Sequence, residues 1–266
     1  MTQTPHDTPL DIAHAQMMAD EGDDAARLRF YERLADCELF LLLIEEPVDE
    51  NVSPQVFEVE GNSFVLVFDR EERLAEFVGD VAPFAALSGR IVASLLAQQG
   101  MGLGLNLEVA PSSILIPPEA IAWLDQTLGN APSEAEAKIE EISTPAGLPE
   151  ALLTGLDTKL ATAAGLAHSA YLVGVTYDNG VRSHLLTFID VVPGAESALA
   201  KAVSEALVFS GIEAGALDVS FARSADAMAA TLAKWGLKFD LPQPEEAQEV
   251  GRAAPGSDPE KPPILR

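Results

Sequence analysis

The sequence predicts an α+β fold of two related modules, each a small, mainly antiparallel sheet packed with helices. The strongest observation is Asn179-Gly180 between runs of β-branched and aromatic residues, because this pair favours the positive φ angles of a type I′ hairpin turn. The expected elements also follow one order in both halves: helix, hairpin strands, helix, strand, helix. With 48% hydrophobic residues in 266, the chain can bury one large or two modest domain cores.

The N-terminal module is expected over residues 23–128, behind a flexible acidic arm. The arm, residues 1–22, is polar with little periodicity. The first helix is expected behind Asp24 as its N-cap, and the apolar run Glu38–Glu45 then predicts a buried strand. Gly61-Asn62 lies between two β-rich runs and predicts a hairpin.

Three more helices are expected in this module. Asp69 with Glu72 three residues later resembles a capping box and predicts a short helix. An apolar stripe from Phe84 to Leu95 predicts a second helix that ends at Gly100. Pro117-Pro118 opens a third, and the short apolar runs before it, at 103–109 and 114–116, predict strands.

The C-terminal module is expected over residues 148–239, after a linker at 129–147 that is rich in Pro and Glu. It begins with a leucine-rich helix. In the hairpin that follows, a two-residue loop predicts that Val175 faces His184 and lies on the same side of the sheet as Leu186. A helix is therefore expected to pack against that side of the sheet.

Three further elements and a tail complete the expected chain. A helix bearing Leu199 and Leu207 precedes the short strand Leu217–Phe221, and a last helix runs from Ser224 to Trp235. Residues 240–266 are rich in proline and acidic side chains, which predicts a disordered tail.

Charge narrows the classes of partner. The 42 acidic and 16 basic residues give a formal charge of −26, which repels nucleic-acid backbones and anionic membranes. The start of the chain has no signal-peptide pattern, and no apolar run approaches the roughly 20 residues of a spanning helix. These observations favour a cytoplasmic protein that binds neither nucleic acid nor membrane.

Residues that could carry chemistry are sparse. Cys37 is the single cysteine, with no histidine near it in sequence, and inert burial is favoured over a nucleophile. His168 and His184 lie on or beside the same hairpin, but no cysteine or carboxylate cluster has ligand spacing, which argues against zinc. We expect no cofactor, no metal and no enzymatic activity.

The candidate partner surface is Gly100, Gly102, Gly104 and Asn106. The order helix, glycines, strand is the reverse of a dinucleotide-binding loop. Three glycines in five residues permit close backbone approach, and Asn106 is a polar residue within an apolar strand. A strand near a sheet edge would accept an extended segment of a partner, whereas the structural alternative is close packing with Asn106 bonded to a turn.

Several segments resemble a known family. The strand Leu39–Ile44, the junction Val67-Phe68-Asp69, and the run Gly100–Asn106 followed by Ile116–Ile121 resemble the N-terminal domain of the SseB family, the serine-sensitivity-enhancing proteins. Ala170-Tyr171-Leu172 with its hairpin resembles that family's C-terminal domain. The resemblance implies a bacterial cytoplasmic protein without established catalytic residues.

Together these observations predict a non-enzymatic protein that binds another protein. The identity of the partner and the oligomeric state remain open. Two alternatives are a regulator of an enzyme of serine-related amino-acid metabolism and an acidic protein that resembles secretion chaperones.

Overall fold

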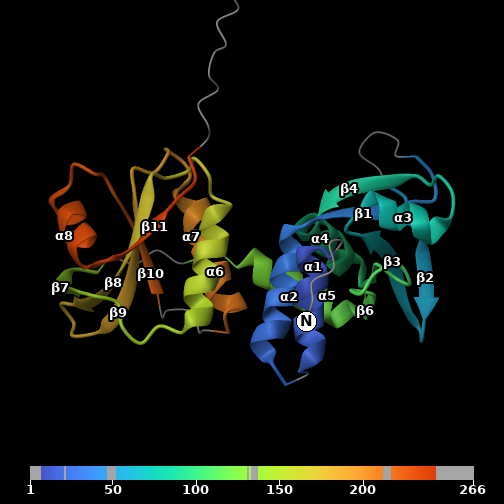
Figure 1. Ribbon diagram of the computed structural model, residues 1–266, viewed down its shortest axis with the longest axis horizontal. Coiled ribbons are helices and arrows are strands. Elements are labelled where there is room, and N and C mark those ends of the chain that lie inside the picture. Colours follow the sequence, from blue (N-terminus) through green and yellow to red (C-terminus); the bar gives the residue numbers. More distant parts are fainter. Residues whose placement is uncertain are drawn as a thin grey trace, which may run out of the picture.

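The computed structural model describes residues 7–20, 22–46, 52–130, 132, 137–211 and 217–243. It contains two α+β modules side by side, each built on its own mixed sheet (Figure 1). The predicted fold class is thus confirmed. The N-terminal elements are α1 (Pro9–Ala19), α2 (Asp24–Asp36), β1 (Glu38–Leu42), β2 (Val56–Val59), β3 (Asn62–Phe68), α3 (Glu71–Val78), β4 (Phe84–Ser88), α4 (Gly89–Gln99), β5 (Gly102–Leu105), β6 (Ile114–Ile116) and α5 (Pro118–Gly129). The C-terminal elements are β7 (Ile139–Ser143), α6 (Glu150–Ala161), β8 (Ser169–Tyr177), β9 (Arg182–Ile189), α7 (Glu196–Phe209), β10 (Leu217–Ala222), α8 (Ala227–Trp235) and β11 (Leu237–Asp240).

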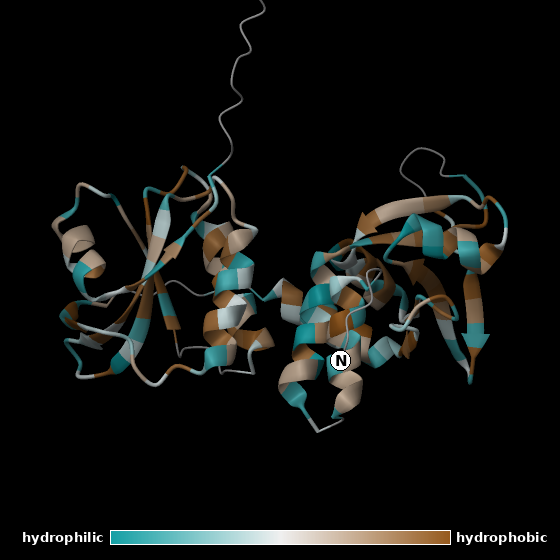
Figure 2. Ribbon diagram, in the orientation of Figure 1, coloured by the Kyte–Doolittle hydropathy of each residue, from teal (hydrophilic) through white to brown (hydrophobic). Residues whose placement is uncertain are grey.

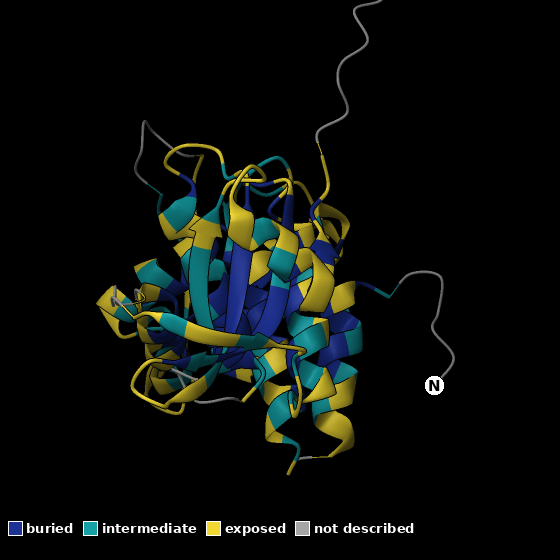
Figure 3. Cartoon of the chain, turned by 90° about the vertical axis from the view of Figure 1, so that its left-hand side faces the viewer, coloured by how far each residue is buried: buried dark blue, intermediate teal, exposed yellow. Residues whose placement is uncertain are grey.

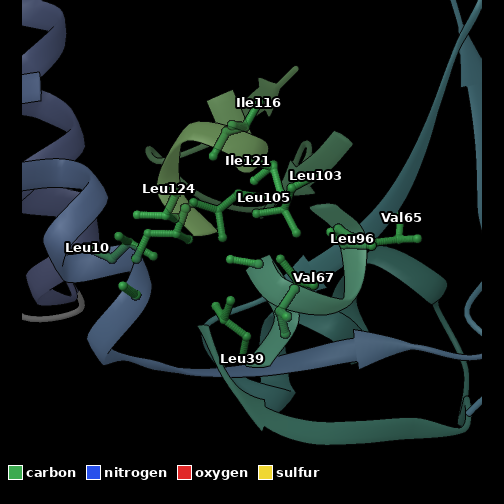
Figure 4. Close-up of a cluster of buried hydrophobic side chains, with 14 of the residues drawn as sticks. Leu10, Leu39, Val65, Val67, Leu96, Leu103, Leu105, Ile116, Ile121 and Leu124 are labelled. Carbon is green, nitrogen blue, oxygen red and sulfur yellow. The ribbon is translucent and has the colours of Figure 1, made fainter. Parts of the chain in front are cut away.

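The N-terminal sheet has the strand order β4-β1-β3-β5-β6, with β2 paired to the first half of β3. Only β3 and β5 run parallel to each other among these pairs. One side of the sheet packs against α1, α2, α4 and α5, and the leucines, valines and isoleucines in Figure 4 form that core. On the other side α3 is the one helix among the described elements, and its Leu74 packs against Leu66 and Phe68. This second side is therefore the less covered one.

The expected flexible arm is wrong for residues 8–19, which belong to the N-terminal core. Thr8 and Asp11 form a reciprocal capping box, with Thr8 Oγ1 accepting from the Asp11 amide at 3.1 Å. Pro9 begins the helix, and Leu10 is buried. The segment has no amphipathic stripe that would have marked a helix, but Thr8 followed by Asp11 is a capping signal that the sequence does offer.

The helix expected from Phe84 is instead the strand β4 followed by α4. The apolar residues of this stripe fit helical spacing, but β1 needs a partner on its outer side and β4 supplies it over the five pairs from Glu38↔Ser88 to Leu42↔Phe84. Ser88 then caps α4, because its hydroxyl accepts from the Ile91 amide. At residues 84–88, pairing with β1 rather than the local helical periodicity determines the secondary structure.

Gly89 lets α4 start against the backbone of α2. A Cβ at this position would lie 1.8 Å from the carbonyl oxygen of Leu34, which is backbone and cannot rotate away. We expect Gly89→Ala to lower the free energy of unfolding in urea by about 1–3 kcal/mol or more through overpacking. Gly129→Ala is the matched control, since a Cβ there meets nothing within 4 Å. Equal stability of the two variants would contradict this account.

The C-terminal sheet has the order β10-β9-β8-β11, with β7 paired to the second half of β8. Helices α6 and α7 pack on one side through Leu152, Leu156 and Leu199, and α8 packs on the other through Leu232. Figure 3 looks onto this module and shows its central strands largely buried. Each sheet thus contains a hairpin whose second strand pairs in parallel with a later strand, β3 with β5 and β9 with β10.

Two predicted boundaries of this module need correction. The linker proposed at 129–147 contains β7, which pairs antiparallel with β8. The disordered tail proposed from residue 240 is wrong for residues 240–243, because Leu241 is buried and Gln243 Nε2 donates to the carbonyl of Ala167 at 3.1 Å. The remainder of that tail, residues 244–266, lies outside the described residues.

The central hairpin has a register one residue away from the predicted one. Tyr177 N donates to Val181 O and Gly180 N donates to Tyr177 O, so the loop has three residues rather than two. His184 consequently faces Gly174 instead of Val175. Val175 and Leu186 then lie on opposite sides of the sheet, in different core clusters, because a shift by one residue reverses every side chain.

Helices α2 and α4 of the first module meet α6 and α7 of the second around a cluster of ions. Lys159 Nζ lies 2.6 Å from Asp36 Oδ2, 3.2 Å from Glu205 Oε2 and 3.5 Å from Glu32 Oε1. Arg90 donates from both Nη atoms to Glu205, each at 2.7 Å, and also reaches Asp36. We call these five residues the interface ion cluster.

The interface ion cluster has three carboxylates and two cations among its five residues. Burial raises the pKa of Glu32, and the attraction of Lys159 offsets this effect only in part. Glu32 Oε1 has no hydrogen-bond partner among the described residues, and it lies 3.5 Å from Lys159 Nζ as an ion pair. For Glu205, burial alone would also raise the pKa, but the bonds from Arg90 and the charge of Lys159 outweigh burial and lower it.

Candidate protein-binding surface

The predicted site residues lie inside the N-terminal module. β5 lies next to the edge strand β6 but pairs with β3 on one side and β6 on the other, so it has no free side for a partner strand. A Cβ at Gly102 would lie 2.4 Å from the Phe64 ring and 2.7 Å from the Ile116 carbonyl oxygen. A Cβ at Gly104 would meet Leu66 at 2.7 Å. The glycines therefore permit close packing of strands.

Gly100 and Asn106 hold the two ends of this segment. Gly100 terminates α4 in the left-handed conformation, with φ of 63°. Asn106 has φ of 48° and is fully buried. Its Oδ1 accepts from the Asp69 amide at 3.1 Å and its Nδ2 donates to Ser112 Oγ at 2.8 Å. Asn106 thus ties the end of β3 to the loop before β6, which is the turn-stabilising alternative.

Asn106 belongs to a buried polar network centred on Arg73. Arg73 Nη2 donates to Asp11 Oδ2 at 2.5 Å and Nη1 donates to Asp69 Oδ1 at 2.7 Å. Ser112 Oγ donates to Asp11 Oδ1, and Thr8 Oγ1 donates to Asp69 Oδ2. These side chains join α1, α3 and two loops to one another. The hydrogen-bonding groups of these side chains are paired with one another, so the network is suited to stabilising the fold.

The network lowers the pKa of Asp11. Burial raises that pKa, but hydrogen bonds from Arg73, Ser112 and the Thr8 amide outweigh it and bring the value to about 2, from an ordinary 3.8. A carboxyl with a depressed folded-state pKa contributes stability above its unfolded pKa and loses it as the pH falls.

We therefore expect an acid limb in stability that depends on Asp11. The contribution, about 2 kcal/mol, is complete above about pH 4 and lost as the pH falls toward 2. Urea unfolding between pH 5 and 2 measures it, and Asp11→Asn is expected to flatten the limb from a lower starting stability. An unchanged limb in Asp11→Asn would assign the acid sensitivity to other carboxyls.

The remaining candidates for chemistry lie apart from one another. His184 contacts the Ala146 carbonyl oxygen through Nε2 at 3.0 Å, and Cys37 lies at the end of α2 in the other module. In the described part of the chain, no three His, Cys, Asp or Glu side chains come together as a metal site would require. Across those same residues, no helix has the length and apolar character needed to cross a bilayer.

Cys37 is expected to react slowly in the folded protein. Burial, with the charges of Asp69 and Asp36, raises the pKa of its thiol to about 12, and Sγ donates to the Leu34 carbonyl. Iodoacetamide at pH 8 should label the native protein on the order of a hundredfold more slowly than the urea-unfolded chain, because the thiolate is the reactive form. Equal rates would contradict this burial.

β4 is an edge strand of the N-terminal sheet and lies at the top of that module in Figure 1. β4 pairs only with β1 among the described strands, and its middle residue Ala86 is exposed. Its sequence Phe-Ala-Ala-Leu-Ser has no charged residue and no proline, and it is mostly hydrophobic in Figure 2. Such an edge is a ready partner for another strand.

The other described strands with a free side are protected. A charged side chain on an edge strand opposes pairing with a second chain, and a very short strand offers little to pair with. The charged residues are Glu58 in β2, Glu140 and Glu141 in β7, Asp218 in β10, and Lys238 and Asp240 in β11, while β6 has three residues. β4 is the exception among them.

An apolar hollow adjoins the start of β4. Its volume is about 500 Å³, and Pro83, Val56 and Val78 are among the residues that line it. Val81 at its rim has 96% of its surface exposed and Ile44 has 68%. We call β4 and this hollow, with Ile44 and Val81, the β4 surface. Its exposed aliphatic side chains are grouped, and grouped exposure marks interaction sites.

The β4 surface is built from segments without a basic residue. Residues 34–69, which include β1 to β3, contain no Lys or Arg, and neither do residues 74–89. Glu45, Glu46 and Asp80 are exposed at its margins. The surface is therefore apolar within an acidic surround, which favours a partner with basic side chains.

A larger hollow of about 910 Å³ lies near α3 and is a weaker candidate. Its lining mixes Asp7, Glu72 and Glu76 with Arg70 and Arg73. Arg73 is already bound by Asp11 and Asp69. The hollow therefore presents opposed charges rather than one recognisable chemistry.

Residues 12–123 match the family model of the SseB protein N-terminal domain. No curated protein and no solved structure matches the chain. The matched range runs from α1 into α5 and so contains both the buried polar network and the β4 surface. The resemblance of the C-terminal module to the C-terminal domain of the family stays a prediction.

Proposed function

Because this chain belongs to the SseB family through its N-terminal domain, we propose that it is a non-enzymatic protein that binds another protein through the β4 surface. The observation that carries the proposal is the group of exposed aliphatic side chains, Ile44, Val56, Val78 and Val81, around one hollow of a chain with a formal charge of −26. A chain this acidic keeps such a group exposed at little risk of self-association, because copies of it repel one another.

The polar groups of the N-terminal module support this reading over catalysis. Arg73, Asp11, Asp69 and Asn106 bind one another, and a catalytic group needs a face turned to substrate. A bacterial cytoplasmic location belongs to the same proposal, since the lone Cys37 is compatible with a reducing compartment.

Site-specific photocrosslinking in native cells tests the proposal. A photoreactive amino acid at Val81 should capture a discrete protein, whereas the same group at Val181, which is 53% exposed in the C-terminal module, should not capture it. The purified pair should then bind in solution, and Ile44→Asp should weaken the affinity at least tenfold without changing the melting temperature, because Ile44 is exposed. The same products at both positions, or none at either, would refute the proposed surface.

A further inference from the structure

The hydrogen bonds of β4 show which of its backbone groups are open. Leu43 N donates to Pro83 O and Gly89 N donates to Cys37 O, at the two ends of the β1–β4 ladder. Bonded and non-bonded pairs alternate in an antiparallel ladder, so residues 83, 85, 87 and 89 direct their backbone groups to β1. Phe84 and Ala86 therefore direct their N–H and C=O groups outward, to the free side of the sheet.

We propose that β4 accepts an extended peptide segment of the partner as an added strand, with alternating apolar residues and basic flanks. This inference rests on the proposed function and names the chemistry of its partner. Phe84 and Ala86 supply the backbone bonds through neutral outward groups that pair with no other described residue. The added strand would match five residues, about 17 Å of extended chain.

Side-chain preferences follow from what lies on the two sides of the sheet. Phe84 packs edge-on against Phe40 at 5.5 Å between ring centroids, on the side that α3 covers only in part, and both rings remain half-buried. Alternate residues of the added strand would extend this aromatic surface, which favours apolar side chains there. The exposed acidic residues at the margins, Glu45, Glu46 and Asp80, favour basic residues at the ends of the segment.

A second copy of the chain is the less suitable occupant. Pairing β4 with another β4 would bring together two molecules that each carry a formal charge of −26, with Glu45, Glu46 and Asp80 at the margins of each surface. Like charges placed opposite one another oppose association. A partner with basic flanks removes this repulsion.

The test starts from a display library of random twelve-residue peptides selected on the full chain. The enriched peptides are expected to alternate apolar residues between Lys or Arg flanks. The best peptide is then synthesised with a single N-methyl group at each successive backbone amide, and its affinity is measured by fluorescence anisotropy. N-methylation should reduce affinity at least tenfold at every second position of the paired segment and little at the positions between, because only alternate amides face β4.

Two protein variants complete the test. Ala86→Pro removes an outward N–H and leaves the bonds to β1 in place, so it should abolish peptide binding while the chain keeps its melting temperature. Ala86→Ser keeps the N–H and should bind like the parent. The methylation series needs no variant, so it decides the matter even if Ala86→Pro unfolds.

Three results would overturn the inference: enriched peptides without alternation, equal effects of N-methylation at all positions, or self-association that Ala86→Pro abolishes. The last would assign the edge to a second copy. If crosslinking at Val81 finds a partner and the methylation pattern is absent, the inference fails while the proposed function stands. If neither experiment gives a specific product, both fail.

Discussion

Replacement of Lys159 by methionine is expected to destabilise the protein by about 3–5 kcal/mol, because it removes the buried cation shared by three carboxylates. Lys159 and Glu205 have side chains only 5% exposed, so water replaces little of the lost attraction. Urea unfolding at pH 7 measures the change. The two modules are also expected to unfold in separate transitions in the variant, since the cluster joins them.

Lys138→Met, at an exposed position, is the control for the loss of one positive charge. The sign of the pH dependence gives a second check. Burial already raises the pKa of Glu32, and without Lys159 the main attraction that opposes this effect is lost, so the variant regains stability relative to the parent as the pH falls from 7 to 5. A destabilisation below about 0.5 kcal/mol at pH 7 is the size of an ordinary surface change, and it would show that the interface ion cluster does not stabilise the protein.

Arg73→Met is expected to have an effect of similar size within the N-terminal module, about 3–5 kcal/mol. The substitution leaves Asp11 and Asp69, with side chains 2% and 4% exposed, as neighbouring carboxylates without a cation. Unfolding in urea at pH 7 and pH 4 measures the deficit, which should shrink at the lower pH as one carboxyl takes up a proton.

The neighbouring Arg70→Met serves as the matched control. Arg70 lies three residues away, is partly exposed and precedes α3 without a side-chain cap. Its replacement should change stability by no more than about 0.5 kcal/mol. If the two arginine variants lose equal stability, the buried network contributes no more than a surface charge does.

The sequence predicts elements well where the local pattern and the tertiary need agree. The buried strand after α2, the helix opened by Pro117-Pro118 and the class of the fold are examples. β4 is the counterexample. Phe84 and Leu87 belong to an apolar stripe that also fits a helix. They form a strand because β1 needs a hydrogen-bonding partner along its outer edge.

The two hairpins show the same limit at the level of turns. Asn179-Gly180 has the composition of a two-residue turn, yet the loop takes three residues and Gly180 alone of that pair has positive φ. The two-residue turn occurs instead at Glu60-Gly61, where both residues have positive φ. Composition marks that a turn exists, whereas the packing of the flanking side chains decides its register.

The predicted site residues are buried for a related reason. Three glycines near Asn106 indicate close backbone approach, and this holds, but the approaching groups belong to the chain itself. The β4 surface gave a weak signal, because an uncharged five-residue strand is recognisable as an edge only once the neighbouring strands are known. The absence of Lys and Arg from residues 34–69 was visible in the sequence and becomes informative when those residues share a surface.

One side chain of α7 has a consequence for where this protein can be cut. Phe209 comes from the C-terminal module but is buried in the core cluster of the N-terminal module, where its ring lies 6.4 Å from Trp123. The family match ends at residue 123, inside α5, so a polypeptide trimmed to the match would lose both the rest of that helix and the phenyl ring that seals its core. The range matched by the family model and the range needed for an intact N-terminal core therefore differ in this chain. Gene fusions or truncations that follow the family match are expected to yield an aggregation-prone fragment, because they expose the apolar residues that Phe209 covers.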